Sequence, residues 1–264
     1  MHTRLAVLSL LISSGAFAQF SNPYTNSYGF RFNNPISASL NQMMWDRINQ
    51  QMLLKSMLRK KGFTDAQLNG MSSDQLLASL GGGKQAAEES KKVPAPAASR
   101  FKPSVKRLLT PALAASLTKE PEQQKVLLQI FEAGLTAYAT EAGKEGLGND
   151  LAGAVAFFLG AAMMVSHDGV APDDDGLTLV ARQLQQVFDT PEMKKAPDAD
   201  KQKFFELLVG MGSWILASWQ VAVETNDEPL KAQLEEAAAG VIKGFLKLEP
   251  SQVQITAAGL QISK

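Results

Sequence analysis

The chain has 264 residues, with 26 Lys and Arg against 26 Asp and Glu, so its formal net charge is zero, and it contains no cysteine. A balanced charge gives no field that attracts nucleic acid, so nucleic acid is not an expected partner. The lack of cysteine excludes disulfides, thiol nucleophiles, thiolate metal sites and a lipoprotein cysteine. The length is sufficient for one or two packed domains.

Residues 1–18 have the pattern of a secretory signal peptide. Arg4 precedes a mostly apolar run, and an A-x-A cleavage site ends at Ala18, directly before Gln19. We therefore predict cleavage after Ala18 and a secreted or periplasmic mature protein.

Residues 19–35 form a predicted extended arm that is rich in asparagine, glycine, proline and aromatic side chains. This density of aromatic residues is unusual for a fully solvated tail. The arm either folds back over its own domain, docks onto a protein partner in the envelope or outside the cell, or is disordered. Tyrosine and phenylalanine are effective anchors in protein interfaces. The candidate partner-binding residues are Phe20, Tyr24, Tyr28, Phe30 and Phe32.

Residues 36–80 are predicted to form a small helical unit. Over 36–61 the apolar residues recur at helical spacing, and four of them are methionines, which suit either an adaptable binding face or ordinary packing. Thr64 followed by Gln67 is a capping signal for a short helix. Residues 81–100 have almost no large apolar side chain, which predicts a flexible linker.

From residue 101 to the end, apolar spacing predicts a bundle of about six helices. A first helix opens at Pro103 and is broken or kinked at Pro111. After the last helix the pattern alternates apolar and polar residues, which predicts two short strands or a hairpin. The other expected helices run from Pro121 through Tyr138, over 151–166, from Pro172–Asp175 through Phe188, over 200–226 and over 230–248.

Two of these helices are strongly apolar. The run 151–166 carries no charge on any face, and 204–223 carries only Glu206. A helix that is apolar all round is either the buried centre of a bundle or a membrane segment, and sixteen residues fall short of the roughly twenty that span a bilayer. We expect a buried central helix, with membrane insertion as the alternative.

The candidates for metal and nucleophilic chemistry are few. His167 is the histidine that remains after signal cleavage, and we expect it at a helix C-terminus with Gly169 as the cap rather than as a catalytic base. Counting twelve residues from Asp168 or Asp173 reaches a leucine where a calcium loop requires glutamate. No metal and no cofactor are predicted.

Carboxylates are the remaining catalytic candidates. Glu206 lies within an apolar helix, so it is either a desolvated acid with a raised pKa or a carboxylate that reaches water or a hydrogen-bond donor. Glu132 and Glu141 are the other acidic residues considered for a hydrolase.

Two short motifs carry a family resemblance. With Phe101-Lys102-Pro103-Ser104 near its start and Ile255-Thr256-Ala257-Ala258-Gly259-Leu260 near its end, the segment of about 100–264 resembles a bacterial family of secreted helical proteins of unknown function. The resemblance implies a helical fold and secretion, carries no assigned activity or catalytic residues, and leaves the arm and the N-terminal unit as additions.

We therefore predict an all-α protein: a helical bundle with a short C-terminal hairpin, preceded by a small helical unit. The expected function is that of a non-enzymatic interaction protein. The alternatives are a soluble protein that inserts its apolar helices into membranes and a carboxylate-based hydrolase.

Overall fold

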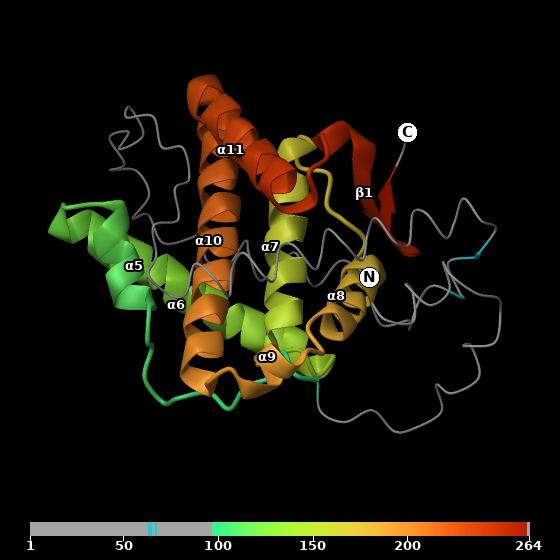
Figure 1. Cartoon of the computed structure of the whole chain (residues 1–264). Helices are drawn as coiled ribbons and strands as arrows, with labels where there is room; N and C mark the ends of the chain where they lie inside the picture. The colour runs from blue at the N-terminus through green and yellow to red at the C-terminus, as the bar shows by residue number, and fades with distance from the viewer. Residues whose placement is uncertain (1–62, 65–66, 68–96, 263–264) are drawn as a thin grey trace.

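The computed structural model describes residues 63, 64, 67 and 97–262 of the chain (Figure 1). Within this part the chain folds as a helical bundle with a two-stranded C-terminal sheet, which confirms the predicted fold class. The helices are α5 (Thr110–Leu117), α6 (Pro121–Lys144), α7 (Leu151–Ser166), α8 (Asp174–Val187), α9 (Pro191–Lys195), α10 (Asp198–Thr225) and α11 (Glu228–Leu246), and a 3-10 turn at Pro250–Gln252 leads into strands β1 (Val253–Thr256) and β2 (Gly259–Ile262).

Helix α7 is the centre of the bundle. It packs against α8, α10 and α11, and almost all of its sixteen residues are buried (Figure 1). The side chain of Asp150 caps its N-terminus by accepting a hydrogen bond of 2.9 Å from the backbone N–H of Ala152. The charge-free run therefore forms a buried central helix with the predicted bounds.

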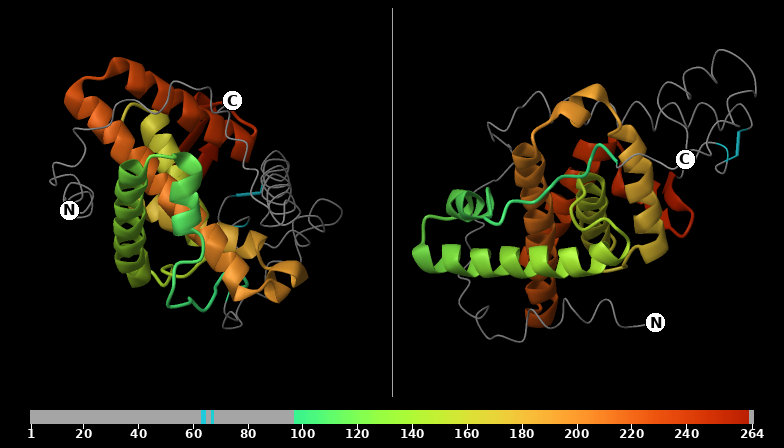
Figure 2. Two further views of the ribbon diagram at one scale, coloured as in Figure 1. Left: turned by 90° about the vertical axis from the view of Figure 1, so that its left-hand side faces the viewer. Right: turned by 90° about the horizontal axis from the view of Figure 1, so that it is seen from below.

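Helix α10 is the second core helix, and α6 lies across it (Figure 2). Of the helices in the described residues, α10 alone has the length and composition of a membrane span, and 67% of that apolar window is buried within the bundle. Burial of this extent is typical of the core helix of a globular domain.

Glycines allow the core helices to approach closely. A Cβ atom added at Gly212 of α10 would lie 2.8 Å from the Phe157 ring of α7, and one added at Gly153 of α7 would collide with the Tyr138 hydroxyl. Gly160 of α7 likewise faces the side chain of Leu177 on α8.

The C-terminal hairpin packs on α8. Strands β1 and β2 are antiparallel with Ile255 opposite Leu260, and Gly259 begins β2 with a φ of +87°, which favours glycine. A Cβ atom at Gly176, in the first turn of α8, would overlap the backbone carbonyl of Thr256. The predicted hairpin is confirmed, and its contact with α8 supplies the packing that an isolated hairpin lacks.

The structure corrects the prediction for the segment before α5. No helix opens at Pro103: residues 101–109 are non-helical, and α5 begins at Thr110. Pro111 lies in the first turn of α5, where the missing N–H costs nothing, so it starts the helix and does not break it.

The predicted N-terminal features mostly lie outside the described residues. The exception is the Thr64–Gln67 pair, where the Gln67 side chain accepts a hydrogen bond of 2.9 Å from the Thr64 backbone N–H, which is one of the two bonds of a capping box. At the end of the predicted linker, Ala98 and Ser99 are buried against the bundle, so the packed domain begins before residue 101.

Candidate functional site

The partner-binding residues predicted from the sequence lie outside the described residues, as does the methionine-rich helix of 36–61. The polar side chains that the structure does bring together are buried at the start of α10 and around the segment that enters the bundle. The buried residues are Thr110, Tyr138, Asp150, Lys201, Gln202 and Glu206, and the exposed Arg100 lies beside Asp150.

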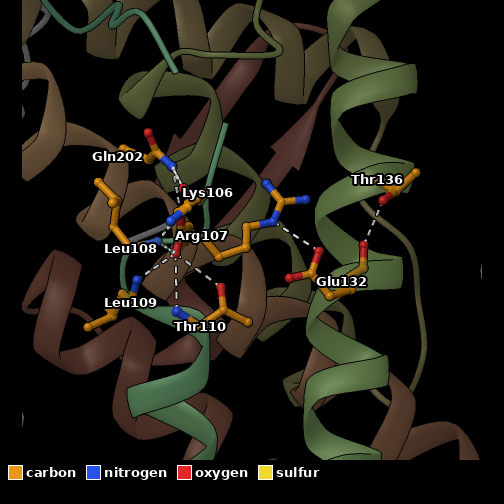
Figure 3. Close-up of polar contacts among 9 residues, drawn as sticks. Lys106, Arg107, Leu108, Leu109, Thr110, Glu132, Thr136 and Gln202 are labelled. Atoms are coloured by element: carbon orange, nitrogen blue, oxygen red, sulfur yellow. Dashed lines mark hydrogen bonds and ion pairs between the residues drawn. The ribbon is translucent and has the colours of Figure 1, made fainter. Parts of the chain in front are cut away.

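Glu206 is the most heavily hydrogen-bonded of them, and its donors Leu108, Leu109, Thr110 and Gln202 are labelled in Figure 3. Its carboxylate accepts from the backbone N–H groups of Leu108, Leu109 and Thr110 at 2.7–3.1 Å, and from the Thr110 hydroxyl at 3.0 Å. The Gln202 side chain, one turn earlier on α10, donates a further bond of 2.8 Å. Glu206 thus supplies the N-terminal cap of α5, although the two lie almost 100 residues apart in sequence.

This environment decides between the two interpretations of Glu206. Burial raises the pKa of the carboxyl, but hydrogen bonds from Leu109, Gln202, Leu108 and Thr110 outweigh burial, and the pKa is lowered below its ordinary value of 4.5. The possibility of a general acid with a raised pKa is therefore wrong for this residue. Glu206 is an ionised carboxylate that holds the chain in place.

Lys201 anchors the segment that enters the bundle. Its side chain is only 5% exposed, and its ammonium group donates to the backbone carbonyls of Ala98 at 2.8 Å and Arg100 at 3.3 Å. Burial lowers the pKa of Lys201 from 10.5, while the charges of Asp198 and Asp150 oppose that shift.

The same segment is paired with the start of α7. The N–H of Leu151 donates to the carbonyl of Ser99 at 3.1 Å, and the N–H of Phe101 donates to the carbonyl of Asn149 at 3.2 Å. Between these bonds, the guanidinium of Arg100 lies 3.6 Å from the fully buried Asp150 carboxylate. Residues 98–101 are thus fixed by backbone pairing and by two cationic side chains, and we call these four residues the anchor.

Tyr138 completes the buried polar set from α6. Its hydroxyl donates to the backbone carbonyl of Leu147 at 3.2 Å, and its ring makes edge-on contacts with Phe157 and Phe205. Burial, with the charge of Asp150 as a smaller cause, raises the pKa of Tyr138 far above 10.0. The phenol therefore keeps its proton above the pH at which an ordinary tyrosine ionises.

The other catalytic candidates do not converge. His167 lies at the C-terminus of α7, as predicted, with Nδ1 2.8 Å from the Met163 carbonyl. The cap residue is His167 itself and not Gly169, because the left-handed turn already begins at Asp168, with a φ of +52°, and continues through Gly169. Glu132 pairs with Arg107 at 2.9 Å and Glu141 with Lys144 at 2.8 Å, both near the surface of α6. Within residues 97–262 and the few described before them, no group of three or more His, Asp or Glu side chains is arranged to hold a metal ion.

Sequence reasoning missed most of this buried set. Asp150 carried a usable signal, because an aspartate directly before an apolar run is typical of a helix N-cap. Lys201 and Gln202 carried none, since polar residues at the start of a helix ordinarily face water.

A family model matches residues 1–263, which is nearly the whole chain. The chain belongs to DUF6683, a family of unknown function. The DUF6683 match includes residues 19–80, so the arm and the N-terminal unit fall within the family's extent and are not additions to it. No curated protein and no solved structure matches the chain.

Proposed function

We propose that this protein is exported and acts as a non-enzymatic interaction protein, in which the helical domain is a scaffold and the aromatic arm of residues 19–35 binds a protein partner. The proposed location, secreted or periplasmic after cleavage at Ala18, depends on the signal-peptide pattern of residues 1–18.

The anchor is the observation that supports separate roles for the helical domain and the arm. The predicted linker ends at residues that are held by Lys201, by Asp150 and by backbone pairing with α7. A domain that only had to carry a loose N-terminal tail would not require two buried charges at the point of attachment, because burying a charge is costly unless it is well paired. The anchor gives the N-terminal segments a fixed origin on a rigid body.

The hydrolase alternative loses its main candidate. Glu206 is the one carboxylate embedded in the apolar core helix α10, and its two oxygens are occupied by donors that fix α5. A general acid or base must reach substrate, and Glu206 is 1% exposed.

Membrane insertion is favoured by one feature, the apolar length of α10. Insertion would also carry Lys201 and Glu206 toward hydrocarbon and break the bonds that each makes in the bundle. Charged groups in hydrocarbon cost several kcal/mol, so the interaction function is the better supported proposal. Dye release from liposomes at acidic and neutral pH tests the membrane alternative.

The test of the proposed function is affinity capture from envelope extract with three versions of the mature protein: wild type, an aromatic variant and a matched control. The aromatic variant replaces Phe20, Tyr24, Tyr28, Phe30 and Phe32 with serine. The control replaces the same number of polar arm residues, Ser21, Asn22, Thr25, Asn26 and Ser27, with alanine. Each version is checked for unchanged helix content.

We expect one component to be enriched by wild type and control and lost with the aromatic variant, and to bind the purified protein directly. Equal capture by all three versions would refute the arm's role. The N-terminus of the protein recovered from its host tests export: it should begin at Gln19, whereas an intact Met1 in the cytoplasmic fraction would contradict the proposal.

A further inference from the structure

Residues 102–109, which we call the strap, run along the outside of α10 between the anchor and α5 (Figure 2). The side chains from Lys102 to Arg107 are exposed, and Val105 is entirely so. Within the strap, the side chain of Leu109 packs against the hydrophobic core. Apolar burial therefore contributes little to holding the strap in place.

Polar contacts from two residues of α10, Gln202 and Glu206, hold the strap instead. The Gln202 side chain accepts from the N–H of Ser104 at 2.6 Å and donates to the carbonyl of Lys106 at 3.0 Å. One turn further along, the Glu206 carboxylate receives the N–H groups of Leu108 and Leu109. The strap is thus fastened by backbone hydrogen bonds to side chains that are themselves buried.

Both ends of the strap are fixed to the bundle. Before it, Phe101 is buried with its ring 5.2 Å from that of Phe205, and Lys201 holds the carbonyl of Arg100. After it, Thr110 is buried as the first residue of α5, which packs on α6 and α10, and it also donates its N–H and hydroxyl to Glu206. A segment with exposed side chains between two fixed ends can detach without unfolding the elements that flank it.

We propose that the strap is a local opening unit of this fold and that the charge on Glu206 is its catch, so that neutralising this one carboxylate releases residues 102–109 while the bundle stays folded. Release uncovers Gln202 and Glu206, which are 3% and 1% exposed when the strap is closed. The proposal does not depend on the arm and is tested separately from it.

Acid neutralises the Glu206 carboxylate and so weakens its hold on the strap. The pKa of Glu206 is lowered from 4.5 in the folded protein, so its contribution is complete above the ordinary value and is lost as the pH falls through the folded value. The donors that bond to Glu206, from the strap, from Thr110 and from Gln202, are neutral. The other carboxylate that contacts the strap is Glu132 of α6, which pairs with Arg107 near the surface, so its variant is the control.

Amide hydrogen exchange of the full mature protein tests the proposal. Glu206→Gln removes the charge and turns a donating amide toward backbone N–H groups. At neutral pH we expect exchange at residues 108–110 to become about tenfold to a hundredfold faster, with the core of α7 unchanged. Glu132→Gln is the matched control: it neutralises an exposed carboxylate whose partner is also on the strap, and we expect less than about a threefold effect.

Two results would overturn the proposal. In one, exchange at 108–110 is unchanged in Glu206→Gln. In the other, it accelerates only together with α7, which would make the carboxylate a global stabiliser and not a local catch. Wild-type protein alone supplies a second test if the variant does not fold: after correction for intrinsic rates, protection of 108–110 must fall between neutral pH and about pH 3.5 while α7 remains protected. Parallel loss in both regions contradicts the proposal.

Discussion

Substitution of Gly134 tests the packing of α6 on α10. A Cβ atom added at Gly134 would lie 2.5 Å from the Cβ of Ser213 on α10 and would collide with the Ser213 hydroxyl. A Cβ atom is bonded directly to the backbone, so the clash is not relieved by rotating a side chain. Gly134→Ala therefore forces the two helices apart by about 1 Å before ordinary contact is restored.

The size of the effect follows from two opposing terms. Overpacking a well-packed core costs about 1–3 kcal/mol, whereas replacing a helical glycine with alanine gains about 0.5–1 kcal/mol. We expect a net destabilisation of about 1–2 kcal/mol, or a Tm lower by about 3–6 °C. The control is Gly240→Ala in α11, where nothing lies within 4 Å of the added Cβ atom. There only the favourable term remains, and stability should rise.

Urea unfolding followed by far-UV circular dichroism measures both free energies. Ser213→Gly removes the atoms that the new methyl group meets, so the double variant Gly134→Ala/Ser213→Gly should be more stable than the sum of the single effects by about 1–2 kcal/mol. If Gly134→Ala is as stabilising as Gly240→Ala, or if the two sites are additive, α6 and α10 do not pack as described.

Three further predictions concern the turns and the buried polar groups. Gly169→Ala should destabilise the protein by about 2 kcal/mol or more in the same urea assay, because its φ is +82° and its added Cβ atom would overlap the Trp219 ring; an unchanged midpoint would contradict this. The Tyr138 phenol keeps its proton in the folded protein but loses it near pH 10.0 in the unfolded chain, so the free energy of unfolding falls as the pH rises above that value. In Tyr138→Phe this free energy should fall less steeply between about pH 9 and pH 11. Equal slopes in wild type and variant would show that the phenol is not buried. Lys201→Met leaves the carbonyls of Ala98 and Arg100 without their donor, so trypsin should cleave after Arg100 much faster than in wild type. Equal resistance to trypsin would show that Lys201 does not hold the anchor in place.

The sequence predicted the elements whose signals are local. Helix α7 has the expected bounds because a charge-free run ends at an aspartate on one side and at His167 and Gly169 on the other. The hairpin was predictable because alternation in β1 and β2 brackets Gly259, which turns the chain with a positive φ.

The strap and the anchor were not predictable because the contacts that fix them are not local in sequence. The apolar spacing of Val105, Leu108 and Leu109 suggested a helix. Instead, the backbone N–H groups of Ser104, Leu108 and Leu109 donate to the side chains of Gln202 and Glu206, almost 100 residues later, and Glu206 also caps α5. The role of Lys201 likewise depends on carbonyls that the linker composition does not indicate. Long-range contacts to the backbone leave no periodic signal in either segment.

The arm is the central claim, and site-specific photocrosslinking in the host tests it most directly. A photoreactive phenylalanine analogue placed at Tyr24 or Tyr28, with Thr25 as the control position in the same arm, records what each side chain touches. The account predicts an adduct with one other protein from the aromatic positions and a weaker one from position 25. An adduct formed only within the chain, with residues 97–262, would show that the arm folds back over its own domain and would contradict the proposed interaction function.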